Sequence, residues 1–143
     1  MKVKQLMNKR PDYITPDTTV QMAAEEMLRR DIGFLPIGDD FEDRLVGALT
    51  DRDIATRCVA KKHDASKVLV KSIMTPKILY CFEDDDIEIA AESMERMQVH
   101  RLAVLNEKKR LVGVLSLGDI AAKTHNPRLC GEILEKICEI SRR

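Results

Sequence analysis

Apolar residues recur along this chain at two spacings, one typical of helices and one typical of short strands. One helical face collects residues at i, i+3, i+4, i+7 and i+8, namely Val20, Ala23, Ala24, Met27 and Leu28. This helix is predicted to start near Thr18 or Thr19. Two apolar runs follow it, at 34–37 and 45–49, and the Gly- and Asp-rich turn between them predicts a hairpin. A second helix is predicted to begin at Thr50.

The same order of elements returns about 67 residues later. VKSIM matches VKQLM, IEIAAESMERM matches VQMAAEEMLRR, and RLVGVLSLGDIA matches RLVGALTDRDIA. The second helical stripe consists of Ile87, Ala90, Ala91, Met94 and Met97. Strands are predicted at 101–105 and 111–115, before a helix that begins at Ser116. Because a short extended stretch, such as 13–15, precedes each first helix, the order is β-α-β-β-α twice, which is an α+β fold class.

The repeat sets the expected domain limits. The first copy covers 1–60, a polar linker covers 61–67, and the second copy covers 68–125. A copy this short buries a poor core by itself, so the two are expected to pack on each other as one pseudo-symmetric module. Residues 126–143 are predicted to form an amphipathic helix that caps the module or a partner subunit, with peptide binding as the alternative. Its apolar side contains Leu129, Ile133, Leu134, Ile137 and Ile140.

Composition narrows the class of partner. The 24 basic and 24 acidic residues cancel, whereas proteins that grip nucleic acid usually carry a basic excess, so nucleic acid is not expected. The sequence contains no apolar run long enough to span a membrane, and its start lacks the apolar core of a secretory signal. We therefore expect a cytoplasmic protein with reduced thiols; its four cysteines are Cys58, Cys81, Cys130 and Cys138.

Two short motifs carry the candidate chemistry, Thr50-x-x-Asp53 and Ser116-x-x-Asp119. One interpretation is a capping box, in which hydroxyl and carboxylate satisfy backbone N–H groups at a helix start. The other is a nucleotide clamp. A helix N-terminus with a hydroxyl attracts phosphate, and a carboxylate one turn later can accept both hydroxyls of a ribose. Capping boxes prefer Glu or Gln at the third position, whereas both copies carry Asp, which favours the clamp. The two interpretations are compatible.

The doubled unit with these motifs resembles the tandem CBS domain pair, which is named after cystathionine beta-synthase. The resemblance covers about residues 1–125, and small stand-alone prokaryotic proteins of two repeats are the most similar. It implies a regulatory module that binds an adenosine-containing ligand, such as AMP, ADP, ATP, NAD or S-adenosylmethionine, in clefts between the repeats. Disc-like homodimers and an unknown effector protein are also implied. Asp51 and Arg52 become Leu117 and Gly118 in the second copy, so the clefts are expected to have unequal affinities.

The resemblance also assigns supporting residues. The stretch 99–120 is similar to a repeat in the gamma subunit of AMP-activated kinase, which implies that His100 and Arg101 face phosphate. The alternative is an exposed, solvated corner. In the first copy, Gly33 and Phe34 occupy the positions of His100 and Arg101, and Arg52 is the residue that would supply a cation instead. By the family layout, the base slot is lined by Asp12, Ile32, Gly33, Phe34, Leu79 and Val99, with Tyr13, Ile14, Tyr80 and Cys81 beside them; ordinary core packing accounts for most of these residues equally well.

Other classes of function have less support in the sequence. No nucleophile–base constellation or Gly-rich phosphate loop is present, so neither an enzyme nor a catalytic cofactor is expected. The acidic run 84–86 precedes a helix and is interpreted as its cap and dipole partner. A metal or redox sensor is an alternative that the cysteine and histidine spacing does not favour. A purely structural dimerisation scaffold with vestigial nucleotide sites also stays open.

Overall fold

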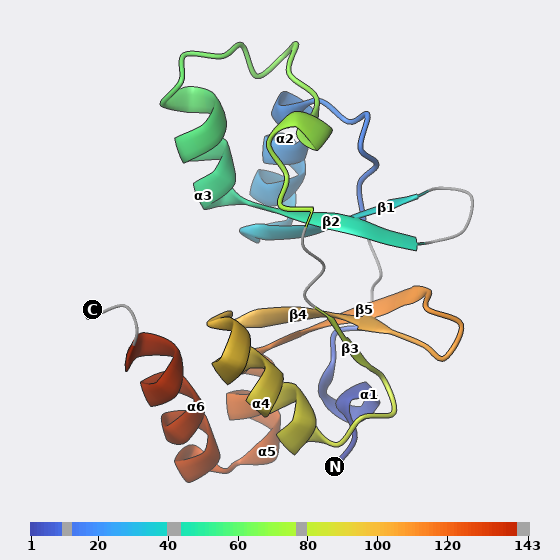
Figure 1. Cartoon of the computed structure of the whole chain (residues 1–143), viewed down its shortest axis with the longest axis vertical. Coiled ribbons are helices and arrows are strands. Elements are labelled where there is room, and N and C mark those ends of the chain that lie inside the picture. Colours follow the sequence, from blue (N-terminus) through green and yellow to red (C-terminus); the bar gives the residue numbers. More distant parts are fainter. Residues whose placement is uncertain (10–12, 40–43, 77–79, 140–143) are drawn as a thin grey trace. The chain divides into compact units, whose positions relative to one another are not determined.

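A computed structural model describes residues 1–9, 13–39, 44–76 and 80–139 of the chain. The chain forms two compact units, one made of Asp12–Ile78 (unit 2) and one made of Met1–Pro11 with Leu79–Arg143 (unit 1). Both contain helices and sheet, as the α+β class predicts (Figure 1). The units do not coincide with the sequence copies. Unit 2 contains most of the first copy and the beginning of the second copy, whereas unit 1 contains the beginning of the first copy and the rest of the second. The limits of the copies themselves stay a prediction.

Unit 2 is built on a hairpin. Strands β1 (Phe34–Asp39) and β2 (Arg44–Thr50) pair antiparallel, with a register shift between Ile37 and Gly38. Helices α2 (Val20–Arg30) and α3 (Asp51–Ile54) lie on one face of this hairpin (Figure 1). Helix α3 continues as the π-helix η1 (Ala55–Val59), and a short 3-10 helix, η2 (Val70–Ser72), completes the unit.

The core of unit 2 confirms most of the predicted helical stripe. It contains Ile14, Val20, Ala23, Met27, Leu35, Ile37, Leu49, Cys58, Val70 and Ile73. Leu28 departs from the prediction, since it is 84% exposed. The equivalent position on the other long helix is Glu95, which pairs with Lys136 of a covering helix at 3.0 Å. Among the described residues, no such helix covers this side of α2, and Leu28 is left in solvent.

Unit 1 is built on a three-stranded sheet in the order β3-β4-β5. Strand β3 (Tyr80–Phe82) runs parallel to β4 (Arg101–Leu105), which pairs antiparallel with β5 (Leu111–Ser116). Helices α4 (Ile87–Met97), α5 (Leu117–Thr124) and α6 (Pro127–Glu139) lie on one face of this sheet, and α1 (Val3–Leu6) completes the unit (Figure 1).

Helix α6 belongs to the core of unit 1. It packs against α4 and α5, and it buries Ile133 and Ile137 beside Met94 and Ile120. Leu134, which the apolar pattern placed on the same side, is 44% exposed. Ile140 lies outside the described residues. The amphipathic helix therefore caps its own unit.

Two equivalent pieces of chain, which we call the docked segments, each complete the unit of the other copy. Residues 2–8 dock in unit 1, where Asn8 exchanges backbone hydrogen bonds with Val114 at 2.9 and 3.1 Å. Residues 69–75 dock in unit 2, where Thr75 exchanges backbone hydrogen bonds with Ala48 at 3.0 and 2.9 Å. Each docked segment thus adds a backbone pairing to the second strand of a hairpin.

The docked segments also correct the interpretation of the acidic run. Asp86 occupies the N-cap position of α4, but its side chain makes no capping hydrogen bond. Instead, Asp86 pairs with Lys2 at 2.9 Å and Asp84 pairs with Lys4 at 2.7 Å. The hydrogen bond from Lys2 lowers the pKa of Asp86, as expected for a carboxylate beside an ammonium group. The side chains of Asp84 and Asp86 therefore pair with lysines of the docked segment, and the Asp86 side chain does not form the predicted cap hydrogen bond.

The glycine at the start of each repeated motif has a structural reason. A Cβ atom on Gly47 would lie 2.9 Å from the backbone oxygen of Thr75, and one on Gly113 would lie 2.6 Å from the backbone oxygen of Asn8. Each glycine thus sits where a docked segment meets the hairpin backbone to backbone. The motif repeats Gly because both hairpins need this close approach.

Candidate functional site

Both motifs form the capping box that the sequence suggested. At the start of α3, Thr50 Oγ1 accepts the Asp53 N–H at 3.1 Å, and Asp53 Oδ2 accepts the Thr50 N–H at 3.0 Å. At the start of α5, Ser116 Oγ accepts the Asp119 N–H at 3.0 Å, and Asp119 Oδ2 accepts the Ser116 N–H at 2.9 Å. The Ser116 hydroxyl also lies 2.9 Å from that oxygen. Asp is therefore long enough to close the box.

Each cap uses only one oxygen of its carboxylate. The other oxygen, Oδ1, faces a cation four residues later: Arg57 Nε lies 3.7 Å from Asp53 Oδ1, and Lys123 Nζ lies 3.9 Å from Asp119 Oδ1. These distances are loose for charge-assisted hydrogen bonds. Capping therefore leaves one carboxylate oxygen in each copy able to accept a further hydrogen bond.

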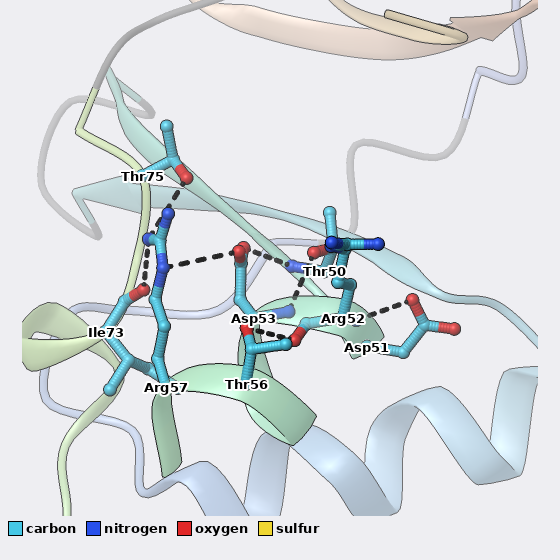
Figure 2. Close-up of polar contacts among 8 residues, drawn as sticks. All are labelled: Thr50, Asp51, Arg52, Asp53, Thr56, Arg57, Ile73 and Thr75. Atoms are coloured by element: carbon cyan, nitrogen blue, oxygen red, sulfur yellow. Dashed lines mark hydrogen bonds and ion pairs between the residues drawn. The ribbon is translucent and has the colours of Figure 1, made fainter. Parts of the chain in front are cut away.

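The two cations were missed by reasoning from the sequence. Arg57 Nη1 donates to the Ile73 carbonyl at 2.9 Å and approaches Thr75 Oγ1 at 3.4 Å, as Figure 2 shows. Lys123 Nζ donates to the Leu6 carbonyl at 2.6 Å. A signal was present, since both cations stand at i+4 from the motif Asp, the spacing of helical ion pairs.

The start of α5 opens on a hollow of about 420 Å³. Its lining includes His100, Arg101, Ser116, Leu117 and Gly118 from the motif side, and Ala121, Cys130, Gly131 and Leu134 from α5 and α6. The Leu117 N–H donates to the His100 carbonyl at 2.9 Å, which holds the β4 start beside the helix start. Among the described residues, no acidic side chain lines this hollow. It therefore combines two basic side chains with the positive end of a helix.

The start of α3 carries an acidic side chain, Asp51, at the position of Leu117. The Asp51 N–H donates to the Gly33 carbonyl at 3.0 Å, the counterpart of the Leu117–His100 bond. Asp51 Oδ1 accepts the Arg52 N–H at 2.9 Å (Figure 2). A Cβ atom on Gly33 would lie 2.6 Å from Asp51 Oδ2, so the carboxylate fills the space that a side chain at position 33 would enter. The first copy thus places an acid where the second copy has His100 and Leu117.

The predicted base-slot residues are placed unevenly. Asp12 and Leu79 lie outside the described residues. Ile32 and Gly33 precede β1, Phe34 begins it, and Val99 lies just before β4. Tyr13 and Ile14 line a second hollow, of about 470 Å³, beside α2, but Thr50 and Asp53 do not line it. The base-binding role of these residues stays a prediction.

All four cysteines are free thiols. Cys58 and Cys81 are buried, Cys130 is half-buried and Cys138 is exposed. Burial raises the pKa of the Cys81 thiol to about 12, and the nearby Asp85 adds to this, so Cys81 is protonated at neutral pH. Among the described residues, no group of three His, Cys, Asp or Glu side chains is placed to hold a metal ion. The described helices also include none long and apolar enough to cross a membrane.

Comparison with known proteins settles the family. The sequence model of the CBS domain matches this chain twice, at residues 3–60 and 70–125. The chain belongs to the CBS domain family. Among its relatives, Hypoxic response protein 1 of Mycobacterium tuberculosis is 37% identical over 119 residues, which is 82% of this chain and 81% of that protein. This CBS pair therefore has relatives of similar size.

Solved CBS pairs with bound ligands are similar to this one. The CBS pair of protein MJ0100, solved with 5′-methylthioadenosine and S-adenosyl-L-methionine, has a TM-score of 0.72 at 27% identity, covering 85% of this chain and 98% of that chain. CBSX2, solved with AMP, has a TM-score of 0.73 at 25% identity, covering 87% and 96%. Hypoxic Response Protein I, solved with two coordinated zinc ions, has a TM-score of 0.78 at 33% identity, covering 86% and 98%.

Relatives that are named as enzymes differ in size. The inosine-5′-monophosphate dehydrogenase of Methanocaldococcus jannaschii is 34% identical over 115 residues, but the match covers only 22% of that enzyme. The CBS pair is thus a small part of the larger protein, and the similarity gives no reason to assign its catalytic activity to this chain.

Proposed function

We propose that this CBS pair is a cytoplasmic regulatory module that binds an adenosine-containing ligand and signals to a partner protein, acting as a homodimer. The observation that carries the proposal is the paired motif: in each copy, the cap leaves Oδ1 of Asp53 or Asp119 outside its hydrogen bonds. A carboxylate oxygen at a helix start is suited to accept ribose hydroxyls. The adenosyl ligands of MJ0100 and CBSX2 support this chemistry.

The second copy is the better site for a phosphate-bearing ligand. Ser116 lies at the positive end of α5, and His100 and Arg101 line the same hollow. The planar guanidinium of Arg101 suits phosphate because it can donate two parallel hydrogen bonds. We therefore assign the phosphate of AMP to this hollow and its ribose to Asp119.

Thermal unfolding tests the proposed function. AMP, ADP, ATP, NAD and S-adenosylmethionine are each added to the wild type and to an Asp53→Asn, Asp119→Asn variant. Ligand at about 100 times its dissociation constant stabilises the folded protein by roughly 2.7 kcal/mol, a shift of several degrees for a protein of this size. We expect at least one ligand to shift the wild type and to leave the variant unchanged. If a nucleotide-free sample shows no shift with any ligand, the motifs are caps only and the scaffold alternative replaces the proposal.

Introducing the acid of the first copy into the second copy tests the assignment of the phosphate. Leu117→Asp gives the second copy the acid that the first copy has at this position, beside His100 and Arg101. We expect AMP to bind this variant at least about tenfold more weakly, because like charges placed together cost several kcal/mol. Binding of the uncharged adenosine stays unchanged, and titration calorimetry measures both. The matched control is Leu117→Asn, and an equal loss of adenosine binding would point to distortion of the site instead.

A further inference from the structure

In each unit, one cation joins a motif carboxylate to a docked segment. In unit 2, Arg57 lies between Asp53 Oδ1 and the carbonyl of Ile73 (Figure 2). In unit 1, Lys123 lies between Asp119 Oδ1 and the carbonyl of Leu6. Leu6 and Ile73 are equivalent positions of the two docked segments, so the same bridge is made twice.

The two bridges are built from different parts. Arg57 belongs to the π-helix η1, whereas Lys123 belongs to the regular helix α5, and the side chains differ in length and shape. They nevertheless reach the same carbonyl position and the same carboxylate oxygen. The bridge therefore does not depend on one helix geometry, because it forms from a π-helix in one unit and from an α-helix in the other.

The position of the cation ties it to the ligand. The cap holds Oδ2 of Asp53, so Oδ1 is the oxygen left to accept a ribose hydroxyl. That oxygen faces Arg57, and Asp53 itself is only 9% exposed. A ligand that binds Oδ1 must therefore change the environment of a guanidinium that also holds residues 73–75. The tight contact is to the segment, at 2.9 Å, and the loose one is to the carboxylate, at 3.7 Å.

We propose that Arg57 and Lys123 are positioning residues that couple ligand on Asp53 and Asp119 to the docking of residues 69–75 and 2–8. This inference rests on the proposed function and adds the side chains through which a bound ligand would change the docking of these segments. By reciprocity of linked equilibria, a ligand that tightens the docked segment is itself held more tightly when that segment is docked.

Hydrogen exchange of residues 69–75 tests the bridge without ligand. The variants are Arg57→Gln, Asp53→Asn and the double substitution, with Lys61→Gln as the control, because the Lys61 side chain is exposed and has no hydrogen bond or ion pair among the described residues. We expect Arg57→Gln to speed exchange several-fold and Asp53→Asn to speed it only while Arg57 is present. Additive effects in the double variant, or equal exchange in Arg57→Gln and Lys61→Gln, would overturn the bridge.

Hydrogen exchange at matched AMP or 5′-methylthioadenosine occupancy tests the coupling. We expect ligand to slow exchange at 69–75 in the wild type and in Arg57→Lys, which copies the other repeat, but not in Arg57→Gln. Equal protection in Arg57→Gln refutes the coupling and leaves the proposed function intact. If neither probe nor any ligand of the thermal-unfolding panel binds the wild type, the coupling to ligand fails together with the proposed function, while the ligand-free experiment still decides whether the bridge exists.

Discussion

Replacing Ile133 with alanine is expected to lower the free energy of unfolding by about 2–5 kcal/mol, the usual cost of removing a large buried aliphatic side chain. Ile133 is fully buried in α6 and shares its core with Met94 and Ile120. Because folded domains are stable by only about 5–15 kcal/mol, such a loss is large. Urea unfolding followed by circular dichroism measures it, and the transition midpoint falls accordingly.

The neighbouring leucine provides the matched control. Leu134 is on the same helix and is 44% exposed, so Leu134→Ala is expected to change the free energy of unfolding by less than about 0.5 kcal/mol. Equal effects of the two substitutions would contradict the packing of α6 on unit 1. The comparison matters because α6 lies beyond the residues that match the CBS model, which end at 125. A helix outside the family match is thus expected to stabilise the fold.

The second large effect is expected at the motif glycines. Gly113→Ala forces a Cβ atom to within 2.6 Å of the Asn8 carbonyl oxygen, and that carbonyl accepts a hydrogen bond from Val114. Backbone cannot rotate away as a side chain can, so the segment must shift or separate. We expect a loss of about 1–3 kcal/mol in the free energy of unfolding, and a smaller loss for Gly47→Ala, where the closest approach is 2.9 Å.

Gly131 is the control for this prediction. It lies in α6 and a Cβ atom there would meet nothing within 4 Å, so Gly131→Ala is expected to stabilise the protein by about 0.4–1 kcal/mol. Thermal and urea unfolding measure all three variants side by side. If Gly113→Ala were as stable as the wild type, the docked segment would not hold this strand through its backbone.

Periodicity predicted the long helices and the hairpin strands. The stripe from Ile87 to Met94 is buried as expected, and the hairpin strands begin and end within two residues of their predicted limits. The extended stretch predicted at 13–15 forms no strand and makes only an isolated bridge between Ile14 and Ile37, so the sheet of unit 2 has two strands. Leu28 was misplaced because the i+8 position is buried only where a further helix covers that side. The periodic pattern describes a single helix and does not indicate which other elements pack against it.

The docked segments left no such signal. Each is held by a few backbone hydrogen bonds and by lysine–carboxylate pairs, such as Lys4 with Asp84, that join residues far apart in the sequence. In the sequence, each docked segment belongs to its own copy, and the repeat does not indicate that the segment packs in the unit of the other copy. Matching glycines were visible in both copies, but only the structure shows which backbone approaches them.

For the candidate site, the sequence predicted the two motifs and left open whether their residues cap a helix, bind a ligand or do both. Thr50 lies beside Asp53, Ser116 lies beside Asp119, and both caps are formed. Whether they also bind a ligand depends on the second carboxylate oxygen and on the charges around it. The contrast between Asp51 in one copy and His100 and Arg101 in the other is visible only in the structure, where each lies beside the start of its helix.

The exchanged segments also set an order in which the chain can reach its final state. Unit 2 is one uninterrupted stretch, so all of its contacts are available once residue 78 has left the ribosome. Unit 1 is divided: α1 is synthesised before unit 2, yet its partners α5 and β5 are synthesised after it. Closing that gap costs entropy that grows slowly with the length between the ends, and a folded unit 2 shortens the free chain to be ordered. Synthesis therefore favours the completion of unit 2 first, and α1 is fixed in place only after β5 and α5 have been synthesised.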